Sequence, residues 1–568
     1  MIAKGIFIYR FISISLGILL LFARQELFAH EDRSFISMQS IGSQSDPYPL
    51  HAKGLVVLGS SQPLLEEETL EDVDGIWTIG YQFPGDKKKI LAQLSTLLNS
   101  GPLTPETVDQ IKQTITQHYD TNGYPLVLVY VPNQEISQGV LQIVVEESTV
   151  GEIFIQGEQW TSAKRLKSYL DLKSHDSIDE FDLFKSLNFM NKNPFRRVDL
   201  IYSPGKEEGT TDITLAVKDR RPFRVYAGSD NTGVKPTDEI RWFSGFNWGN
   251  AFGLDHILSY QYTASYDLHR FQAHTAQYII PLPWKNRINI YGGYNEVVPK
   301  ITHPIMRNTG WGMQASLRYE IPFMVRRFLE QEIDFGGDFK RTNNTFAFTD
   351  ETPHFGKNVN LTQLVLTYSG TYEKNTYRLD FEGDLYCSPC QWVPDQTEKD
   401  YQSLRPGTQP TWVYFRGAFN YLQRIAGASF ALTARGQGSN KALLPSEQFG
   451  LGGYDTVRGY DERVVNKDNA VVINAEFRSP AIPVFKNISH KCSDAFQLLA
   501  FIDAAWGIDH VINPPDSLSD YLIGVGPGIR YTWEPYITGR LDLGIKLHKN
   551  EIIGHANSRI HFSLIVSY

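Results

Sequence analysis

A single arginine stands inside a glycine-rich segment, FGLGGYDTVRGYDER at residues 449–463. Arg458 can act there as an exposed loop charge, as a phosphate ligand, or as one half of an ion pair. A phosphate-binding loop follows a strand and opens a helix, and the run GLGG at 450–453 has no such setting. A guanidinium is a planar, multi-donor group that suits a carboxylate. The third possibility therefore depends on a carboxylate elsewhere in the chain.

Two carboxylates near the end of the chain lie in segments of alternating polarity. In residues 495–506 every second side chain from Ala500 to Trp506 is apolar, so Phe501 and Asp503 lie on the opposite face. In residues 469–478 the same pattern places Glu476 opposite an apolar face. On neighbouring strands either carboxylate can pair with Arg458, and the sequence does not choose between them. We call this predicted contact the loop latch; it comprises the loop residues Val457, Arg458, Gly459 and Tyr460 and the wall residues Phe501, Asp503 and Glu476.

Other chemistry is weakly supported. The chain contains neither Gly-x-Ser-x-Gly nor His-Glu-x-x-His, so we expect no catalytic residues, no cofactor and no metal. Of the three cysteines, Cys387 and Cys390 form a CSPC pair with no second pair for zinc, and Cys492 stands apart. A small disulfide and free thiols both remain open. A formal net charge of −9 argues against a nucleic-acid partner.

The amino terminus predicts export. Lys4 and Arg10 precede the apolar run 11–23, and small residues stand at Ala23 and Ala29, which predicts a signal peptide over residues 1–29. A membrane anchor is the alternative, but the run is short for a spanning helix. Residues 30–51 are polar and predict a flexible lead-in, without the pattern of a stable plug helix.

Two small α+β modules follow in tandem. In residues 52–147 a strand precedes a helix, which Thr104 and Pro105 begin and whose face includes Ile111 and Ile115, and two further strands close the module. Residues 148–221 repeat the order of strand, helices, strand and strand. Such a repeat favours a modular docking arm.

From residue 222 to 568 the helical periodicity is gone. Segments of about ten residues alternate apolar with polar or glycine, as in SRIHFSLIVSY at 558–568. A soluble β-sandwich is the rival, but charge and glycine recur in mid-strand on one face and aromatic residues recur at segment ends. At roughly 20 residues for each strand and loop, this region holds about 16 strands. We therefore predict a transmembrane β-barrel of 16 strands.

Counting back from the end places the glycine-rich segment. The last five predicted strands are 469–478, 495–506, 520–533, 538–548 and 558–568. With both ends of the barrel on the periplasmic side, the loop before residue 469 is the sixth outer loop. We predict that this loop, near residues 440–468, folds back into the lumen and brings Arg458 to the wall.

These residues also carry a family resemblance. VRGY at 457–460 resembles the loop motif of the BamA-like outer-membrane superfamily, and FID at 501–503 resembles its wall motif, usually Phe-x-Asp-x-Gly; this chain departs from the wall motif at Ala505. The segments 119–147, 187–205 and 209–233 are similar to the two-partner secretion transporters of the ShlB/FhaC/HecB family. The resemblance runs from about residue 52 to the end.

The resemblance implies a function. It implies two periplasmic POTRA domains, a 16-stranded outer-membrane barrel, and secretion, with possible activation, of one large unfolded exoprotein such as a haemolysin or adhesin. Outer-membrane lipid and the barrel assembly machinery are the other implied partners. The alternatives are a BamA-like insertase, which shares the loop and barrel, a passive porin, which needs no periplasmic modules, and an outer-membrane enzyme.

Two further sets of residues carry expectations. Sheet edges can accept an added strand from a partner, and a candidate docking edge in the first module comprises Tyr124, Val129, Pro132 and Gln134. Packing of the module itself is the alternative for these residues. Tyr568, the last residue, suits an aromatic signal for barrel assembly, or is a membrane-interface aromatic.

Overall fold

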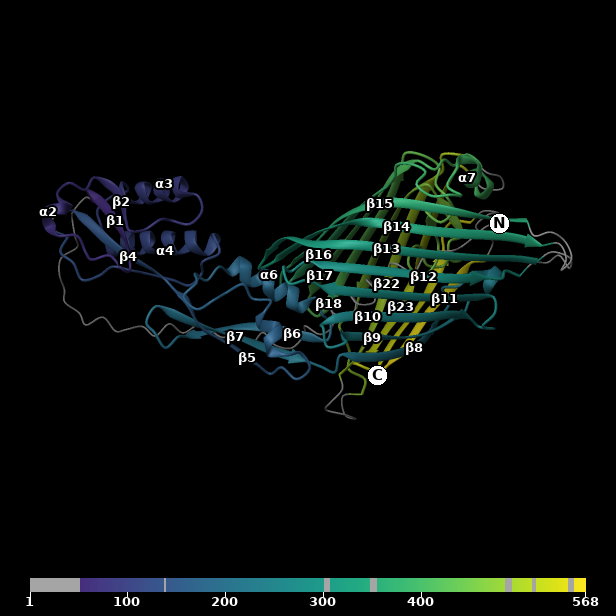
Figure 1. Cartoon of the computed structure of the whole chain (residues 1–568), viewed down its shortest axis with the longest axis horizontal. Coiled ribbons are helices and arrows are strands. Elements are labelled where there is room, and N and C mark those ends of the chain that lie inside the picture. Colours follow the sequence, from purple (N-terminus) through teal and green to yellow (C-terminus); the bar gives the residue numbers. More distant parts are fainter. Residues whose placement is uncertain are drawn as a thin grey trace. The chain divides into compact units, whose positions relative to one another are not determined.

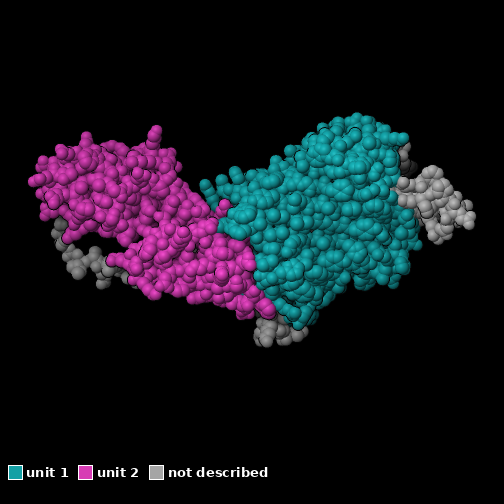
Figure 2. Space-filling model, viewed as in Figure 1, with its two compact units in different colours: residues 1–22, 193–195, 219–568 teal, residues 23–192, 196–218 magenta. Residues whose placement is uncertain are grey.

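The computed structural model describes residues 52–136, 139–300, 307–347, 355–485, 493–512, 517–549 and 556–568. The predicted signal peptide, the lead-in and Cys492 lie outside these residues. Two compact units are present (Figure 2), one formed by residues 193–195 and 219–568, the other by the described residues up to Lys192 together with Arg196–Lys218. Within the described ranges, no helix is both long and apolar enough to cross a membrane.

The first module is a four-stranded sheet with helices (Figure 1). The sheet order is β2-β1-β4-β3, with β1 parallel to both neighbours and β3 antiparallel to β4. The strands are β1 (Gly54–Gly59), β2 (Gly75–Ile79), β3 (Val127–Tyr130) and β4 (Val140–Glu147), and the helices are α2 (Glu67–Leu70), α3 (Lys87–Leu98) and α4 (Pro105–Thr121). Strand β2 and helix α2 were not predicted from the sequence.

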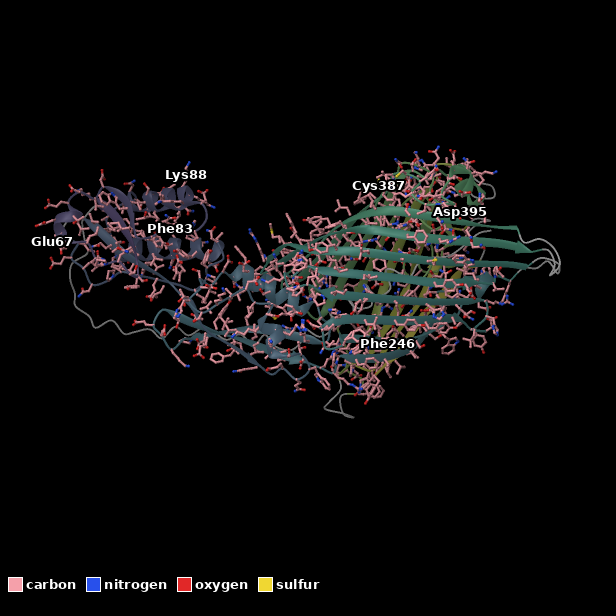
Figure 3. The ribbon with its side chains drawn as sticks, in the orientation of Figure 1. Glu67, Phe83, Lys88, Phe246, Cys387 and Asp395 are labelled. Carbon is pink, nitrogen blue, oxygen red and sulfur yellow. The ribbon has the colours of Figure 1, made fainter. Side chains whose placement is uncertain are left out.

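Helix α4 shows why this module folds as it does. The hydroxyl of Thr104 accepts a hydrogen bond from the backbone N–H of Thr107 at 3.2 Å, and so caps the first turn. On its inner face Ile111 and Ile115 are fully buried against the sheet. Phe83 joins the same core, whereas Lys88 on α3 points to solvent (Figure 3).

The second module repeats the pattern with three strands. Strand β7 lies between β5 and β6, and β5 runs parallel to β7. Helix α6 is capped by Asp179, whose carboxylate accepts from the backbone N–H of Phe181 at 2.8 Å, and it buries Leu183 and Met190. The elements are β5 (Thr149–Gln156), α5 (Ala163–Lys167), α6 (Glu180–Asn191), β6 (Arg196–Pro204) and β7 (Thr210–Asp219).

The rest of the chain forms a closed barrel of 16 antiparallel strands, which confirms the predicted count. The first eleven are β8 (Phe223–Asp230), β9 (Arg241–Ala251), β10 (His256–Ser265), β11 (Phe271–Pro281), β12 (Arg287–Val297), β13 (Arg307–Arg326), β14 (Leu329–Ala347), β15 (Phe355–Glu373), β16 (Tyr377–Ser388), β17 (Trp412–Ile425) and β18 (Ala428–Ser439). The last five are β21 (Asn469–Arg478), β22 (Asp494–Ile508), β23 (Ser519–Trp533), β24 (Ile537–Lys546) and β25 (Ser558–Ser567).

Alternation along the wall separates an apolar outer face from a charged inner face. On β22, Ile502 is 52% exposed and Trp506 is 48% exposed, whereas Asp503 between them is fully buried. On β24, Leu541 is exposed and Asp542 is fully buried. Lipid outside and a polar lumen inside account for this pattern.

The barrel closes where its last strand meets its first. Strand β25 pairs with β8 only from Ser563 opposite Asp230 to Ser567 opposite Tyr226. By contrast, β13 and β14 pair along nearly their whole length. The closing line is the shortest ladder in the described wall.

Side-chain and terminal hydrogen bonds extend this closing line. The side chain of Asn231 accepts from the backbone N–H of Phe562 at 2.9 Å and donates to the carbonyl of Ile560 at 2.6 Å. At the opposite end, Tyr568 and Val225 exchange backbone hydrogen bonds of 2.9 and 3.0 Å. The Tyr568 side chain is 79% exposed on the outside.

A short helix, α7 (Glu398–Leu404), lies in the fifth outer loop, at the end of the barrel away from the carboxyl terminus (Figure 1). Thr397 and Asp400 form a capping box that begins it. Its buried side chains Tyr401 and Leu404 pack with Leu443 of the sixth loop. Cys387 and Cys390 near this end are free thiols, and Cys387 lies on the same end as Asp395 (Figure 3).

Candidate functional site: the loop latch

The chain between β18 and β21 folds back inside the barrel. Its two sides pair as a short antiparallel ribbon, β19 (Phe449–Leu451) with β20 (Val465–Lys467). Beyond the ribbon, Gly452 and Gly459 have φ values of 94° and 99°, a region that favours glycine. These turns bring Arg458 to the inner face of the wall, where its side chain is almost completely buried.

Arg458 and Asp503 form a two-pronged ion pair. The Nε atom lies 2.7 Å from Oδ2 and the Nη2 atom lies 2.8 Å from Oδ1. The backbone N–H of Arg458 also donates to Oδ2, at 3.0 Å. Asp503 therefore holds both the side chain and the main chain of the loop.

Two more carboxylates contact the same guanidinium. The Nη1 atom of Arg458 lies 2.5 Å from Oε1 of Glu476 and 3.4 Å from Oδ2 of Asp542. The two partners that the sequence left open thus both pair with Arg458, and β24 supplies a third, Asp542. Asp542 lies in the predicted strand 538–548, but the alternation of that strand does not give its distance from Arg458.

The rest of the loop motif also packs against the wall. The Arg458 guanidinium carbon lies 3.5 Å from the ring centre of Phe501, a cation–π contact. Val457 is fully buried with Leu522 and Ala505 in one apolar cluster. Ala505 replaces the glycine of the related wall motif, and its methyl group takes part in this cluster.

Tyr460 and Gly459 form hydrogen bonds to groups on or next to strands β23, β24 and β25. The Tyr460 hydroxyl lies 2.9 Å from the carbonyl of Ile523 and 2.8 Å from that of His548. The backbone N–H of Gly459 donates to Nε2 of His561 at 3.0 Å. All seven predicted latch residues therefore meet at one place, spread over β21, β22 and the loop.

Wall glycines allow the loop backbone to approach. A Cβ atom on Gly544 would lie 2.1 Å from the backbone nitrogen of Gly459, and one on Gly524 would lie 2.1 Å from the carbonyl oxygen of Arg458. Backbone cannot yield at such distances as a side chain can. The lumen is thus shaped for this loop at two positions on neighbouring strands.

Replacing Gly544 by alanine is expected to push the loop off the wall. Overpacking of this kind costs about 1–3 kcal/mol, so the unfolding temperature should fall and single-channel conductance should rise. Gly539→Ala on the same strand is the control, because a Cβ there meets nothing nearer than 3.9 Å. Equal conductance in the two variants would contradict the close fit.

Arginines surround the latch carboxylates. Arg530 and Arg540 lie 2.6 and 2.8 Å from Asp542, and Arg478 lies 2.6 Å from Glu476. The Arg540 guanidinium stacks on the ring of Tyr454 in the loop, 3.7 Å from its centre. Buried charges are tolerated when they are paired and hydrogen-bonded, and this network satisfies that condition.

A second charge network holds the base of the sixth loop. Arg405, just after α7, binds Asp468 with Nη1–Oδ1 and Nη2–Oδ2 distances of 2.5 and 3.1 Å, and Asp509 at 3.0 Å. Lys467 binds Asp509 at 3.0 Å and Asp520 at 2.9 Å. Loop 5, loop 6, the residue that follows β22 and strand β23 therefore meet through buried ion pairs that could not be predicted from the sequence.

Glu447 attaches the sixth loop to a third part of the wall, at strands β14 and β17. Its carboxylate is fully buried and binds Lys340 of β14 at 2.9 Å and the Tyr414 hydroxyl of β17 at 2.7 Å. Its backbone carbonyl accepts from Arg416 at 2.7 Å. The sixth loop is thus tied to both sides of the lumen.

The predicted docking residues lie mainly within the first module. Tyr124 and Val129 pack against its core, and burial raises the pKa of the Tyr124 hydroxyl above its ordinary value. The Gln134 side chain binds the backbone of Gln142 on β4, at 2.6 and 2.8 Å. Pro132 is half-buried beside them. The observed contacts of Tyr124, Val129 and Gln134 are therefore contacts within the module itself, which is the alternative given for these residues above.

Sequence comparison places the chain among transport proteins. Residues 209–529 match the family described as haemolysin secretion/activation protein ShlB/FhaC/HecB, and residues 85–148 match the ShlB-type POTRA domain. The outer membrane transporter CdiB of Dickeya dadantii (strain 3937) is 22% identical over 398 residues, 68% of each chain. The heme/hemopexin transporter protein HuxB of Haemophilus influenzae (strain ATCC 51907 / DSM 11121 / KW20 / Rd) is 23% identical over 407 residues, 66% of each chain. The matched part thus spans about two thirds of these relatives.

Solved structures agree on the fold. CdiB from Escherichia coli superposes with a TM-score of 0.74 at 16% identity, covering 94% of this chain and 93% of that one. CdiB from Acinetobacter baumannii gives a TM-score of 0.68 at 16% identity, covering 98% and 97%. Since the family match extends over more than half of the residues, the chain belongs to the haemolysin secretion/activation family ShlB/FhaC/HecB, outer-membrane transporters with POTRA modules in the periplasm.

Proposed function

We propose that this transporter secretes one cognate exoprotein, in an unfolded state, through the lumen that the sixth loop occupies. The observation that carries the proposal is the buried clamp of Arg458 on Asp503, Glu476 and Asp542. A loop held inside the barrel by ion pairs closes the conducting path at rest. In this proposal, the loop latch keeps the conducting path through the lumen shut or correctly shaped.

The relatives support a protein cargo. They include transporters named for heme/hemopexin and for haemolysin, the latter being ShlB of Serratia marcescens, 24% identical over 263 residues. The exoprotein proposed for this chain is of the same general kind, a large secreted protein. Deleting the chain from its host should leave such an exoprotein in the periplasm, and restoring the chain should return it to the medium.

A BamA-like insertase is the second candidate. It would share the barrel and the folded-in loop, but the family match favours secretion. The deletion separates the two functions, because loss of an insertase would lower the amounts of many barrel proteins in the outer membrane. A normal content of barrel proteins together with loss of one exoprotein supports secretion, and the reverse result overturns it.

We further propose domain limits of 52–147 and 148–221 for the two POTRA domains, with the exoprotein docking on the first. Strand β3 is the last strand of its sheet, so its outer edge is available for an added strand. On this strand Leu128 is 58% exposed and Tyr130 is 38% exposed. These two side chains, rather than the inward-facing Val129, give the edge its apolar surface. Tyr568 is proposed to serve as the assembly signal, consistent with its position at the closing line.

Replacing Leu128 and Tyr130 together by serine is expected to weaken exoprotein binding by roughly tenfold or more. The variant lacks two large apolar side chains, and the bound exoprotein would otherwise cover the exposed part of each, about half of its surface. The measurement is the affinity of the purified transporter for the amino-terminal domain of the exoprotein. Leu64→Ser, at a similarly exposed position away from β3, is the matched control. A larger loss for Trp77→Ser on β2 would move the docking site to the opposite edge of the sheet.

A further inference from the structure

Aromatic side chains form a belt on the outer face of the barrel, near the end that carries the carboxyl terminus. The rings of Tyr372 and Tyr377 lie 5.8 Å apart, and those of Tyr377 and Tyr421 lie 6.3 Å apart. Tyr372 and Tyr377 stand on either side of the turn from β15 to β16, and Tyr372 is on the same face of β15 as Tyr368, which is 40% exposed. Aromatic rings of this kind mark the level of the membrane interface. Groups beyond the belt therefore lie at the level of the lipid headgroups.

Cations gather just beyond this belt at two neighbouring turns. Arg326 and Arg327 are at the turn from β13 to β14, and Lys374 is at the turn from β15 to β16; all three are exposed. The backbone N–H of Glu373 donates to the carbonyl of Phe328 at 2.9 Å. This bond places the two turns side by side, so their cations share one surface.

The cations are held over aromatic rings. The Arg327 guanidinium lies 5.6 Å from the ring centre of Phe328, and the Lys374 ammonium lies 5.9 Å from the same ring. Lys374 also lies 5.8 Å from the ring centre of Tyr372. Because Phe328 is 45% exposed, the surface combines an apolar ring with charges on either side of it.

The carboxylate next to Lys374, Glu373, is used on the lumen side. Glu373 binds Arg378 and Arg424, each at 3.3 Å. Within the described residues, no ion pair joins Arg327 or Lys374 to a carboxylate. The outer surface at these turns is therefore cationic, while Glu373 beside it faces inward and is neutralised there.

We propose that the turns carrying Arg327, Phe328 and Lys374 bind the headgroup of an anionic phospholipid of the periplasmic leaflet. The cations contact the phosphate and the Phe328 ring enters the upper part of the acyl chains. Charge complementarity and continuity with the lipid-facing wall select this occupant. Two other turns at this end differ: the one from β9 to β10 presents the apolar Phe252, and the one from β23 to β24 contains Glu534.

The test uses the full-length transporter in vesicles that contain phosphatidylethanolamine and phosphatidylglycerol in equal amounts. After gentle extraction, the ratio of phosphatidylglycerol to phosphatidylethanolamine bound to the protein is measured by native mass spectrometry. Each cation near an anionic surface contributes about fivefold, so Arg327→Gln with Lys374→Gln should lower this ratio by roughly 25-fold. Raising the salt concentration should lower the ratio for the unchanged protein and not for the double variant.

The matched control removes two exposed lysines at the opposite end of the barrel, Lys235→Gln with Lys300→Gln. The control should keep the ratio of the unchanged protein. Exchange of the two cations, Arg327→Lys with Lys374→Arg, should restore it and guards against a misfolded variant. An equal fall in the control, or an unchanged ratio in the double glutamine variant, overturns the proposal.

Discussion

Replacing Arg458 by alanine is expected to release the sixth loop from the wall. The change leaves Asp503 and Asp542 buried with fewer partners, and breaking a buried ion pair in this way costs about 3–5 kcal/mol. Secretion should fall strongly, and single-channel conductance should rise because the lumen is no longer filled. Arg458→Lys should behave similarly, since an ammonium cannot repeat the two-pronged contact with Asp503.

A double-mutant cycle tests whether the effect arises at this pair. Arg458→Ala combined with Asp503→Ala should cost little more than either change alone, because both remove the same interaction. Lys235→Ala is the matched control: Lys235 also pairs with the loop, at Asp461 and 2.7 Å, but on the exposed surface. Such a pair contributes about 0–1 kcal/mol. Unchanged secretion in Arg458→Ala would end the latch hypothesis.

Replacing Arg405 by alanine is expected to separate the fifth outer loop from the sixth. Asp468 and Asp509 would keep only part of their partners in a buried site, again at a cost of about 3–5 kcal/mol. Amide hydrogen exchange should increase in α7 and in the β19–β20 ribbon together, while exchange in the POTRA modules stays as before. The joint response would show that the two loops are fixed as one body by this network.

The control for this experiment is Lys399→Ala, which removes an exposed cation from α7 itself. It should leave both exchange profiles unchanged. If Arg405→Ala alters α7 alone, the network fixes only the fifth loop and the proposed connection to the sixth is wrong. SDS gel electrophoresis of unheated samples, in which folded barrels migrate faster, verifies that each variant has formed a barrel.

Much of the barrel could be predicted because alternation is a local property of the sequence. The alternation predicts the final strands to within a few residues of their observed bounds, and the predicted strand 469–478 agrees fully with β21. The inward direction of Asp503 and Glu476 followed from the same pattern. What alternation cannot give is the height of each residue along the wall, which depends on the register between strands. Asp542, in the predicted strand 538–548, could therefore not be identified from the sequence as a partner of Arg458.

Other features could not be predicted from the sequence, for a different reason. Helix α7, the β19–β20 ribbon and the pairing of Arg405 with Asp468 arise in long outer loops, where no periodic pattern precedes the tertiary contacts. Strand β2 was missed because five residues at a sheet edge give little periodicity. The predicted docking edge includes Val129 because this residue lies in a strand, but the sequence does not show which face of β3 the helices cover.

The short ladder between β25 and β8 has a mechanical consequence. Long pairings such as β13 with β14 resist peeling over their whole length, whereas the closing line depends on few main-chain bonds and on the Asn231 amide. Elements with few hydrogen bonds open at the lowest free energy. The barrel wall is thus not equally strong around its circumference. The junction of β25 with β8 is its weakest line, and strain on the wall concentrates there.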